Sequence, residues 1–341
     1  MKNIDLENHF LSKAFFNYLK DRTEYPRFEK GIGIIHREGA VFPAIDKPLF
    51  NPPHTIFEEV ADIDARRLSI MDNCGVTNAS VSSLDGMEDL PKDDCIRMAK
   101  ATNDEIAAAV KKHPDRFFGS FCLPSPYIEE SLEEIDRAVN GLGLKYWHTH
   151  SSYAGCSLDD EKFEPVFAKL SKMDIAFYVH PAYPSNPYLL DTGIAFASAG
   201  FGFGVDTMKT TMRLILRGVF DRYPNLKMIL GHMAEFYPYL CDRMDNRFDS
   251  LKFMDPINKK QHSFDYYFRN KNIFMTTSGI FDPEVAMLAI RKFGVESVMF
   301  GSDYPCESFS GSREFIENLP ISEEDKEKIF YKNAEKYILK K

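Results

Sequence analysis

The sequence of 341 residues has the composition of an ordinary globular protein, with 44% hydrophobic and 27% charged residues. A net charge of −9 and a pI near 5.6 argue against nucleic acid or an anionic membrane as the main partner. No apolar run approaches the roughly 18–20 residues of a membrane span. The stretch MKNIDLENHF lacks a signal-peptide core, and the six cysteines form no Cys-x-x-Cys pair. Reduced thiols in a cytoplasm are therefore expected.

Eight apolar runs predict β-strands, and most of them alternate with helical patterns. The predicted strands are 4–10, 78–83, 117–124, 142–150, 175–181, 226–232, 272–279 and 296–303. The predicted helices are 64–73, 94–112, 128–140, 160–173, 208–222, 283–293 and 323–338. This order predicts an α/β fold, a closed (β/α)8 barrel of the TIM type in a single domain over residues 1–341. An open doubly wound sheet is the alternative, but no strand is followed by a glycine-rich phosphate turn.

Two long segments interrupt the alternation. Residues 11–63 form an insertion after the first strand, and their prolines between 43 and 53 indicate irregular structure. Residues 182–205 form a long loop after the fifth strand that is rich in Tyr, Phe and Gly. Because long loops in compact domains usually carry function, we expect both segments to act as lids or binding loops on one rim of the barrel.

Polar side chains gather at the ends of the predicted strands. The first strand carries Glu7 and His9, the fifth ends in His180, the sixth in His232 and the eighth in Asp303. Buried parallel strands place their chemistry at their carboxyl ends, so these side chains are expected on one rim. Imidazole nitrogen and carboxylate oxygen form the ligand set for Zn, Mn or Fe in open catalytic sites. The pattern favours a metal centre, whereas a Ser or Cys nucleophile has no comparable support.

The sixth strand opens the most informative stretch, LKMILGHMAEFYPYLCDRMDNRF at 226–248. Beyond Gly231 the apolar run gives way to His232, Glu235 and Arg243, which indicates a functional site in the loop and the helix that follows. A helix-capping cluster with surface charges is the alternative interpretation of this stretch taken alone.

Several short strings, in this order and spacing, resemble the amidohydrolase superfamily. They are Glu7-x-His9, His180 followed by Pro181, GHMAE at 231–235 and GSDYP at 301–305. The likeness extends over nearly the whole chain, through HPDRFFGSFCLP, LDDEKFEPVFAKL, LILRGVFDRYPNLKMILGH and KNAEKYI. Within the superfamily, the sequence is most similar to the decarboxylase branch that includes γ-resorcylate, 2,3-dihydroxybenzoate and 5-carboxyvanillate decarboxylases.

The resemblance implies a metal-dependent (β/α)8 barrel with a role for each matching residue. One divalent ion, Mn²⁺ or Zn²⁺, would be bound without any organic cofactor by Glu7, His9, His180 and Asp303. His232 and Glu235 would form a hydrogen-bonded catalytic pair beside the substrate, and Arg243 would contact its anionic group. Asp303 would donate the proton in catalysis. The family also implies a homodimer or homotetramer.

The residue at the first position of the Glu7-x-His9 motif distinguishes a decarboxylase from a hydrolase. Many hydrolases of the superfamily carry His-x-His there, whereas this sequence has Glu7. The added negative charge makes a bound metal a weaker activator of water. We therefore expect non-oxidative decarboxylation of an ortho-hydroxylated aromatic carboxylate that chelates the metal. The alternatives are a metal-dependent lactone or amide hydrolase on the same barrel, and a barrel that binds metal or an aromatic ligand without turnover.

Other polar residues near the predicted strand ends allow more than one interpretation. His148 and His150 end the fourth strand as a second His-x-His, which is either a rival metal pair or, as we prefer, a set of rim and substrate contacts. Lys145 is either a carboxylated bridge between metals or a packed lysine. Arg66 and Arg67 are expected to be solvated or ion-paired at the start of a helix.

Overall fold

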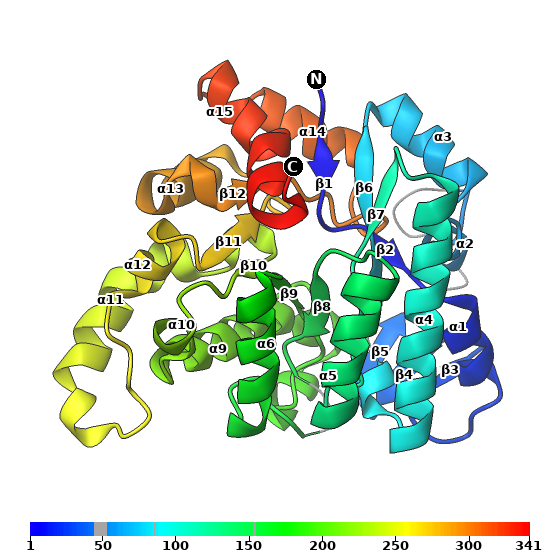
Figure 1. Cartoon of the computed structure of the whole chain (residues 1–341), viewed down its shortest axis with the longest axis horizontal. Helices are drawn as coiled ribbons and strands as arrows, with labels where there is room; N and C mark the ends of the chain where they lie inside the picture. Colours follow the sequence, from blue (N-terminus) through cyan, green and yellow to red (C-terminus); the bar gives the residue numbers. More distant parts are fainter. Residues whose placement is uncertain (44–52, 85, 153–154) are drawn as a thin grey trace.

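The computed structural model of the chain describes residues 1–43, 53–84, 86–152 and 155–341. It is an α/β structure in which helices lie around two parallel sheets (Figure 1). The first sheet contains β1 (Ile4–Asp5), β2 (His9–Phe10), β6 (Asn78–Ser83) and β7 (Phe117–Gly119). The second sheet runs in the order β12 (Val298–Met299), β11 (Ile273–Thr276), β10 (Met228–Leu230), β9 (Phe177–His180) and β8 (Trp147–His150).

The two sheets are hydrogen-bonded to each other at both edges. At one edge the backbone N–H of His148 donates to the carbonyl of Phe121 over 2.8 Å. At the other edge the N–H of Asp303 donates to the carbonyl of Glu7 over 3.0 Å. All strand pairs in both sheets are parallel. The carboxyl ends of the strands therefore face the same side of the molecule, where the sequence carries its histidines and carboxylates.

Side chains alternate along the strands between two apolar clusters. On β9, Phe177 and Val179 belong to the large cluster shared with the helices, whereas Tyr178 joins a second cluster. Strands of both sheets contribute to this second cluster, including Ile4 of β1 and Ile229 of β10. Because the strands are buried on both faces, the sequence shows apolar runs at these positions and little alternation.

The helices around the strands contribute the other side chains of the large cluster (Figure 1). They are α3 (Ala65–Cys74), α4 (Lys92–Lys112), α5 (Ile128–Asp136), α6 (Glu164–Met173), α9 (Gly202–Leu216), α10 (Val219–Arg222), α11 (Tyr237–Ser250), α12 (Phe264–Arg269), α13 (Pro283–Phe293), α14 (Phe309–Glu317) and α15 (Glu323–Glu327). The sequence-based list lacks α12, which is short and aromatic, and α14, which contains Gly311; burial of Phe264 and Phe309 outweighs their weak helix propensity. Among the helices of the described residues, none is both long enough and apolar enough to cross a membrane.

Residues 11–63 are more regular than the sequence indicates. They contain α1 (Lys13–Lys20), α2 (Ile56–Ala61) and an antiparallel sheet of β3 (Arg27–Glu29), β4 (Gly33–Arg37) and β5 (Ala40–Pro43). The sequence does not predict these elements. The prolines that indicate irregular structure begin at Pro43, where β5 ends, and positions 44–52 lie outside the described residues. Gly39, with a φ of 76°, makes the tight turn between β4 and β5.

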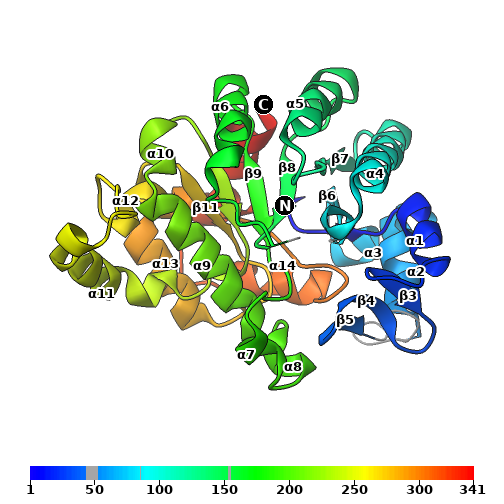
Figure 2. The same ribbon diagram turned by 90° about the horizontal axis from the view of Figure 1, so that it is seen from below.

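The segment 182–205 contains α7 (Pro187–Leu190), α8 (Ile194–Ala197) and the start of α9. It packs against β5, where Ala40, Tyr183 and Ala197 form one apolar cluster. The Tyr183 hydroxyl donates to the carbonyl of Val41. In Figure 2, α7 and α8 accordingly lie at the same end of the molecule as the antiparallel sheet. Two segments far apart in the sequence thus meet beyond the strands.

Substitution of Gly119, at the end of β7, tests how tightly the strands pack against the helices. A β-carbon there would lie 2.5 Å from Cγ2 of Ile106 on α4 and 2.6 Å from Cδ2 of Leu144. We expect Gly119→Ala to lower the free energy of unfolding by about 1–3 kcal/mol, the usual cost of overpacking a core. Denaturant titration measures the change. The control Gly141→Ala would meet only Cγ of Arg137, 3.9 Å away, so its stability should stay near that of wild type, and equal stability of both variants would contradict the packing.

Candidate metal centre

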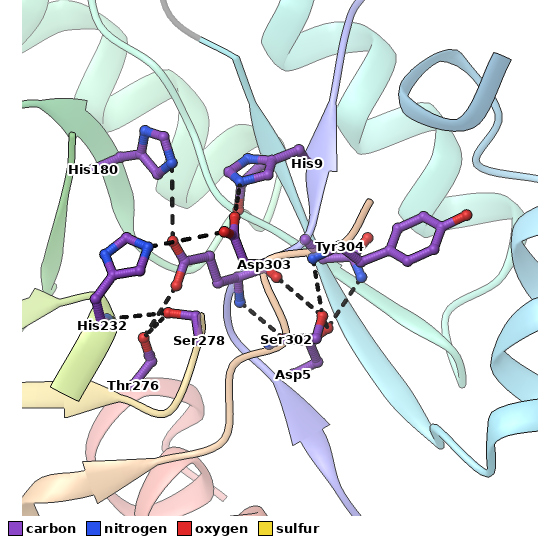
Figure 3. Close-up of polar contacts among 12 residues, drawn as sticks. Asp5, His9, His180, His232, Thr276, Ser278, Ser302, Asp303 and Tyr304 are labelled. Carbon is purple, nitrogen blue, oxygen red and sulfur yellow. Dashed lines mark hydrogen bonds and ion pairs between the residues drawn. The ribbon is translucent and has the colours of Figure 1, made fainter. Parts of the chain in front are cut away.

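The predicted metal ligands lie together at the carboxyl ends of the strands. Ligand atoms of all four lie within 4.8 Å of one another, and the residues are Glu7, His9, His180 and Asp303. His9 Nε2 is 2.8 Å from an oxygen of Asp303 (Figure 3). His180 Nε2 is 3.9 Å from an oxygen of Glu7. Within the described part of the chain, no other group of three or more His, Cys, Asp or Glu side chains converges in this way.

The surroundings of these four side chains fit a cation. One oxygen of Glu7 accepts hydrogen bonds from the hydroxyl of Tyr178 and, over 3.1 Å, from Thr276. The other oxygen of Glu7 and Nδ1 of His9 are buried and have no hydrogen-bond partner among the described residues. A buried carboxylate oxygen without a partner is costly unless a positive charge lies next to it. The donor set of two carboxylates and two imidazoles suits Mn²⁺ or Zn²⁺.

His232 extends this group on the side of Asp303. Its Nε2 lies 3.9 Å from the second oxygen of Asp303, and its Nδ1 lies 3.1 Å from Glu235. Burial alone would raise the pKa of Asp303, but the imidazoles of His232 and His9 hold this pKa below its usual value. Burial opposes protonation of His232, yet Glu235 and Asp303 raise its pKa well above the usual value. A cationic His232 next to an anionic Asp303 is thus the favoured state at neutral pH.

The turn that carries His232 and Glu235 has an unusual backbone. The four residues from His232 to Glu235 have φ values of 54°, 51°, 61° and 54°, and Asp303 has 65°. Residues other than glycine rarely adopt this left-handed region, at a cost of roughly 1–3 kcal/mol each. Contacts around the turn hold it in place. The N–H of His232 donates to Oγ of Ser278 over 3.2 Å, and a β-carbon at Gly204 would lie only 2.7 Å from an oxygen of Glu235.

Arg67 supports the ligands from behind, and the prediction that it is solvated is wrong. The side chain is 1% exposed. Its guanidinium donates to the carbonyls of His9, over 3.1 Å, and Glu59, over 2.5 Å, and to the side chain of Asn8. It also lies 4.5 Å from the centre of the Tyr304 ring. The arginine therefore ties the metal-ligand strand β2 to the loop that follows β12, a long-range contact that the local sequence does not reveal.

Asp5 is a second supporting residue that the sequence does not identify as functional. Its carboxylate accepts hydrogen bonds from Ser302, over 2.9 Å from N–H and 2.6 Å from Oγ, and from the N–H of Glu7 over 3.0 Å (Figure 3). Burial outweighs these bonds and raises the pKa of Asp5 to about 6. The same alternation that groups Glu7 with His9 also includes Asp5, and Tyr178 precedes His180 by two residues, so strand period is the signal that points to both.

A cavity of about 90 Å³ opens over this group. His9, His180, His232 and Asp303 form its polar part. The remaining lining comes mainly from β4 and β5 and from segment 182–205, and consists of His36, Phe42, Leu84, Pro181, Tyr183, Ala199, Phe203 and Cys306. A mostly apolar wall over a polar floor suits a planar aromatic ring with an anionic group.

Arg243, expected to contact the substrate, does not line this cavity. It is exposed on α11, eleven residues beyond His232. Glu235, by contrast, is held beside the cavity through its hydrogen bond to His232. The structure thus brings together the predicted ligands and the His232–Glu235 pair, and leaves Arg243 outside them.

The two histidines of β8 are buried and do not line this cavity. His148 is 1% exposed, and its ring centroid is 5.4 Å from those of His180 and Tyr178. Burial and the neighbouring imidazoles hold its pKa well below the usual value, which keeps it neutral. Nδ1 of His150 lies 3.1 Å from Glu88. Neither histidine belongs to the four-residue group of metal donors, and Lys145 is partly exposed.

Arg67 offers a test of the supporting contacts. We expect Arg67→Met to weaken metal binding by roughly 10–100-fold, the usual effect of removing a residue that orients metal ligands. Manganese titration followed by electron paramagnetic resonance measures the affinity, and circular dichroism verifies that the variant is folded. Arg66→Met is the matched control, since Arg66 is partly exposed on the same helix. Equal metal affinity in the two variants would contradict the role given to Arg67.

The sequence matches the amidohydrolase family over residues 79–337. It is 31% identical over 286 residues to the γ-resorcylate decarboxylase of Polaromonas sp. (strain JS666), which covers 80% of this chain and 86% of that protein. The resemblance noted in the sequence is thus confirmed.

Two solved structures are similar over nearly their full length. One is 5-carboxyvanillate decarboxylase from Novosphingobium aromaticivorans in complex with manganese and 4-hydroxy-3-methoxy-5-nitrobenzoic acid, with a TM-score of 0.86, 28% identity and coverage of 99% of this chain and 96% of that one. The other is dihydroxybenzoic acid decarboxylase from Polaromonas sp. JS666 with manganese and the inhibitor 2-nitroresorcinol, with a TM-score of 0.80, 27% identity and coverage of 98% and 96%. The chain belongs to the amidohydrolase family, in the branch that contains these decarboxylases.

Proposed function

We propose that this chain is a metal-dependent, non-oxidative decarboxylase of an ortho-hydroxylated aromatic carboxylate. The observation that carries the proposal is the convergence of Glu7, His9, His180 and Asp303 beneath a mostly apolar cavity. The names of the relatives support it, because they describe decarboxylases of hydroxylated benzoates, two of them with manganese and an aromatic ligand.

The proposal includes the architecture that carries the site. It is a single domain over residues 1–341, built as a closed (β/α)8 barrel with an insertion after the first strand and a long loop after the fifth. The parallel pairing and the hydrogen bonds at both sheet edges support the barrel. The proposed location is the cytoplasm, which the six free cysteines support.

The roles of the residues follow from their positions. Glu7, His9, His180 and Asp303 would hold one Mn²⁺ or Zn²⁺ ion, and no organic cofactor is required. When bound, the ion supplies positive charge for the carboxylate and ortho-hydroxyl oxygens of the substrate. Cationic His232, 3.9 Å from Asp303 and held by Glu235, passes its proton to Asp303. Asp303 then gives this proton to the ring carbon that bears the carboxylate, and carbon dioxide leaves as the ring regains aromaticity.

Arg243 and His148, the two proposed substrate-binding residues, do not line the cavity of their own chain. We propose that Arg243 reaches a substrate from a second copy, in a homodimer or homotetramer. Exposed aromatic residues on α11 and in the turn that follows this helix support an interface there: Tyr239 is 81% exposed and Phe253 83%. His148 acts on the substrate only through His180, behind which it is packed.

The metal content of variants distinguishes the metal ligands from the catalytic pair His232 and Glu235. We expect Glu7→Ala, His180→Ala and Asp303→Ala to lose the divalent ion or most activity, because the remaining donors no longer offset its desolvation. His232→Asn and Glu235→Gln should keep the metal while the rate falls by roughly 100-fold or more. Elemental analysis of purified and metal-reconstituted protein measures the content. Wild-type protein without a stoichiometric ion would refute the metal site, and loss of metal in His232→Asn would make that residue a ligand.

The reaction itself is tested with a panel of hydroxybenzoates and lactones. We expect carbon dioxide to be released from ortho-hydroxylated benzoates, and poor turnover of benzoates without that hydroxyl, because it completes the chelate and donates electrons to the ring. In deuterium oxide the product should carry deuterium where the carboxylate was, which NMR detects. Cleavage of a lactone or amide with no release of carbon dioxide from any benzoate would establish the hydrolase alternative instead.

A further inference from the structure

The two oxygens of the Glu7 carboxylate have different surroundings. Oε2 accepts hydrogen bonds from the hydroxyl of Tyr178 and, over 3.1 Å, from Oγ1 of Thr276. Oε1 is buried and has no hydrogen-bond partner among the described residues, and it lies 3.9 Å from Nε2 of His180, a proposed metal ligand. Because both hydroxyl donors gather at Oε2, Oε1 is the oxygen that Glu7 presents to a metal ion.

The donors at Oε2 belong to a chain of hydroxyl groups that leads to the turn of His232. The N–H of His232 donates to Oγ of Ser278 over 3.2 Å, and a hydrogen bond of 2.8 Å joins Ser278 to Thr276 (Figure 3). Oγ1 of Thr276 also lies 3.0 Å from the hydroxyl of Tyr178. Donation along this chain towards Glu7 uses each hydroxyl proton once, and polarised chains of this kind strengthen their hydrogen bonds. The chain therefore holds Oε2 firmly on the side of the hydroxyl groups.

Packing fixes the ring of Tyr178 where this contact needs it. The side chain is fully buried, and its ring is stacked on that of His148, with centroids 5.4 Å apart and an interplanar angle of 24°. A β-carbon at Gly231 would lie 3.2 Å from the hydroxyl of Tyr178 and 3.4 Å from both oxygens of Glu7. Contacts of 3.2 Å are too close for a β-carbon, so the glycine leaves the space in which hydroxyl and carboxylate meet.

We infer that Tyr178 is a positioning residue that keeps Glu7 a one-oxygen metal ligand, with Oε1 on the ion and Oε2 held by hydrogen bonds. A carboxylate can bind a cation through one oxygen or through both. Binding through both oxygens takes one more coordination position, and an ortho-hydroxylated carboxylate needs two positions for its own chelate. The hydroxyl of Tyr178 thus keeps a position open for the substrate. This inference rests on the metal site of the proposed function and adds to it a residue that controls access to the ion.

The test is Tyr178→Phe, which removes the hydroxyl and keeps the ring. In crystals of manganese-loaded protein, we expect Glu7 to bind the ion through Oε1 alone in wild type and through both oxygens in the variant. The Kd of 2-hydroxybenzoate for the manganese-loaded variant, measured by calorimetry, should rise by roughly 10-fold or more, the usual scale for losing a residue that orients a metal ligand. The Kd of manganese, measured by electron paramagnetic resonance, should not rise, because Glu7 gains a bond to the ion. A purely structural role would weaken both.

The matched control is Tyr146→Phe, the same change in the same apolar cluster. The hydroxyl of Tyr146 donates to the carbonyl of Leu6 over 3.0 Å and lies 2.9 Å from Oγ of Ser82. Both Kd values of this control should equal those of wild type. An equal rise in the Kd of 2-hydroxybenzoate in the two variants, weaker manganese binding by Tyr178→Phe, or contact of Oε2 with the ion in wild type would overturn the inference. If circular dichroism shows that Tyr178→Phe is unfolded, the crystal structure of manganese-loaded wild type decides.

Failure of the proposed function gives a different result. If Glu7 binds manganese through Oε1 alone but wild type releases no carbon dioxide from any ortho-hydroxylated benzoate, the proposed function fails and the inference stands. If carbon dioxide is released while both oxygens of Glu7 contact the ion, the inference fails and the function stands. Wild-type protein that takes up no stoichiometric divalent ion would overturn both.

Discussion

Two carboxylates, those of Glu7 and Asp303, share one group of buried donor atoms, and the rest of the structure depends on how their charge is balanced. The donor atoms of the two carboxylates lie within 4.8 Å of each other. Like charges this close, away from water, stay ionised only when positive charge or hydrogen-bond donors lie next to them. His9 and His232 provide this for Asp303, while Tyr178 and Thr276 provide part of it for Glu7. The proposed metal ion supplies the remainder. The buried Asp5 and Arg67 then fix the backbone that presents both carboxylates.

The floor and the wall of the cavity have separate origins in the chain. The floor comes from the ends of parallel strands, which the sheet pairings hold in register. The wall comes largely from β4–β5 and from segment 182–205, which contact each other through Tyr183 and Val41. A wall built from inserted segments can change its shape while the strand ends stay fixed. The residues that carry the chemistry and the residues that set substrate specificity therefore come from different parts of the chain.

Much of the site could be predicted from the sequence, because strand ends and short motifs are local. Glu7 and His9 lie two residues apart in the first predicted strand, His180 and Asp303 end apolar runs, and parallel pairing brings such positions together. Helices with a clear apolar period, such as α13, are predicted with their bounds. The antiparallel sheet and the buried Arg67 could not be predicted. The pairing of β4 with β5 shifts register between Ile35 and Arg37, and the contact of Arg67 with His9 is long-range, so neither leaves a periodic pattern in the sequence. The same holds for Arg243, whose distance from the cavity depends on the direction of α11 and not on its spacing from His232.

The left-handed turn from His232 to Glu235 has a consequence for the order in which the molecule loses its structure. Glycine would suit the backbone at positions 233 and 234, yet the chain has Met233 and Ala234, whose side chains are 1% and 0% exposed. Burial of these two side chains holds the turn against its own conformational preference. When packing around them loosens, the turn relaxes locally while the strands remain paired. We therefore expect the His232–Glu235 pair to be lost under mild heating or denaturant before the sheets unfold.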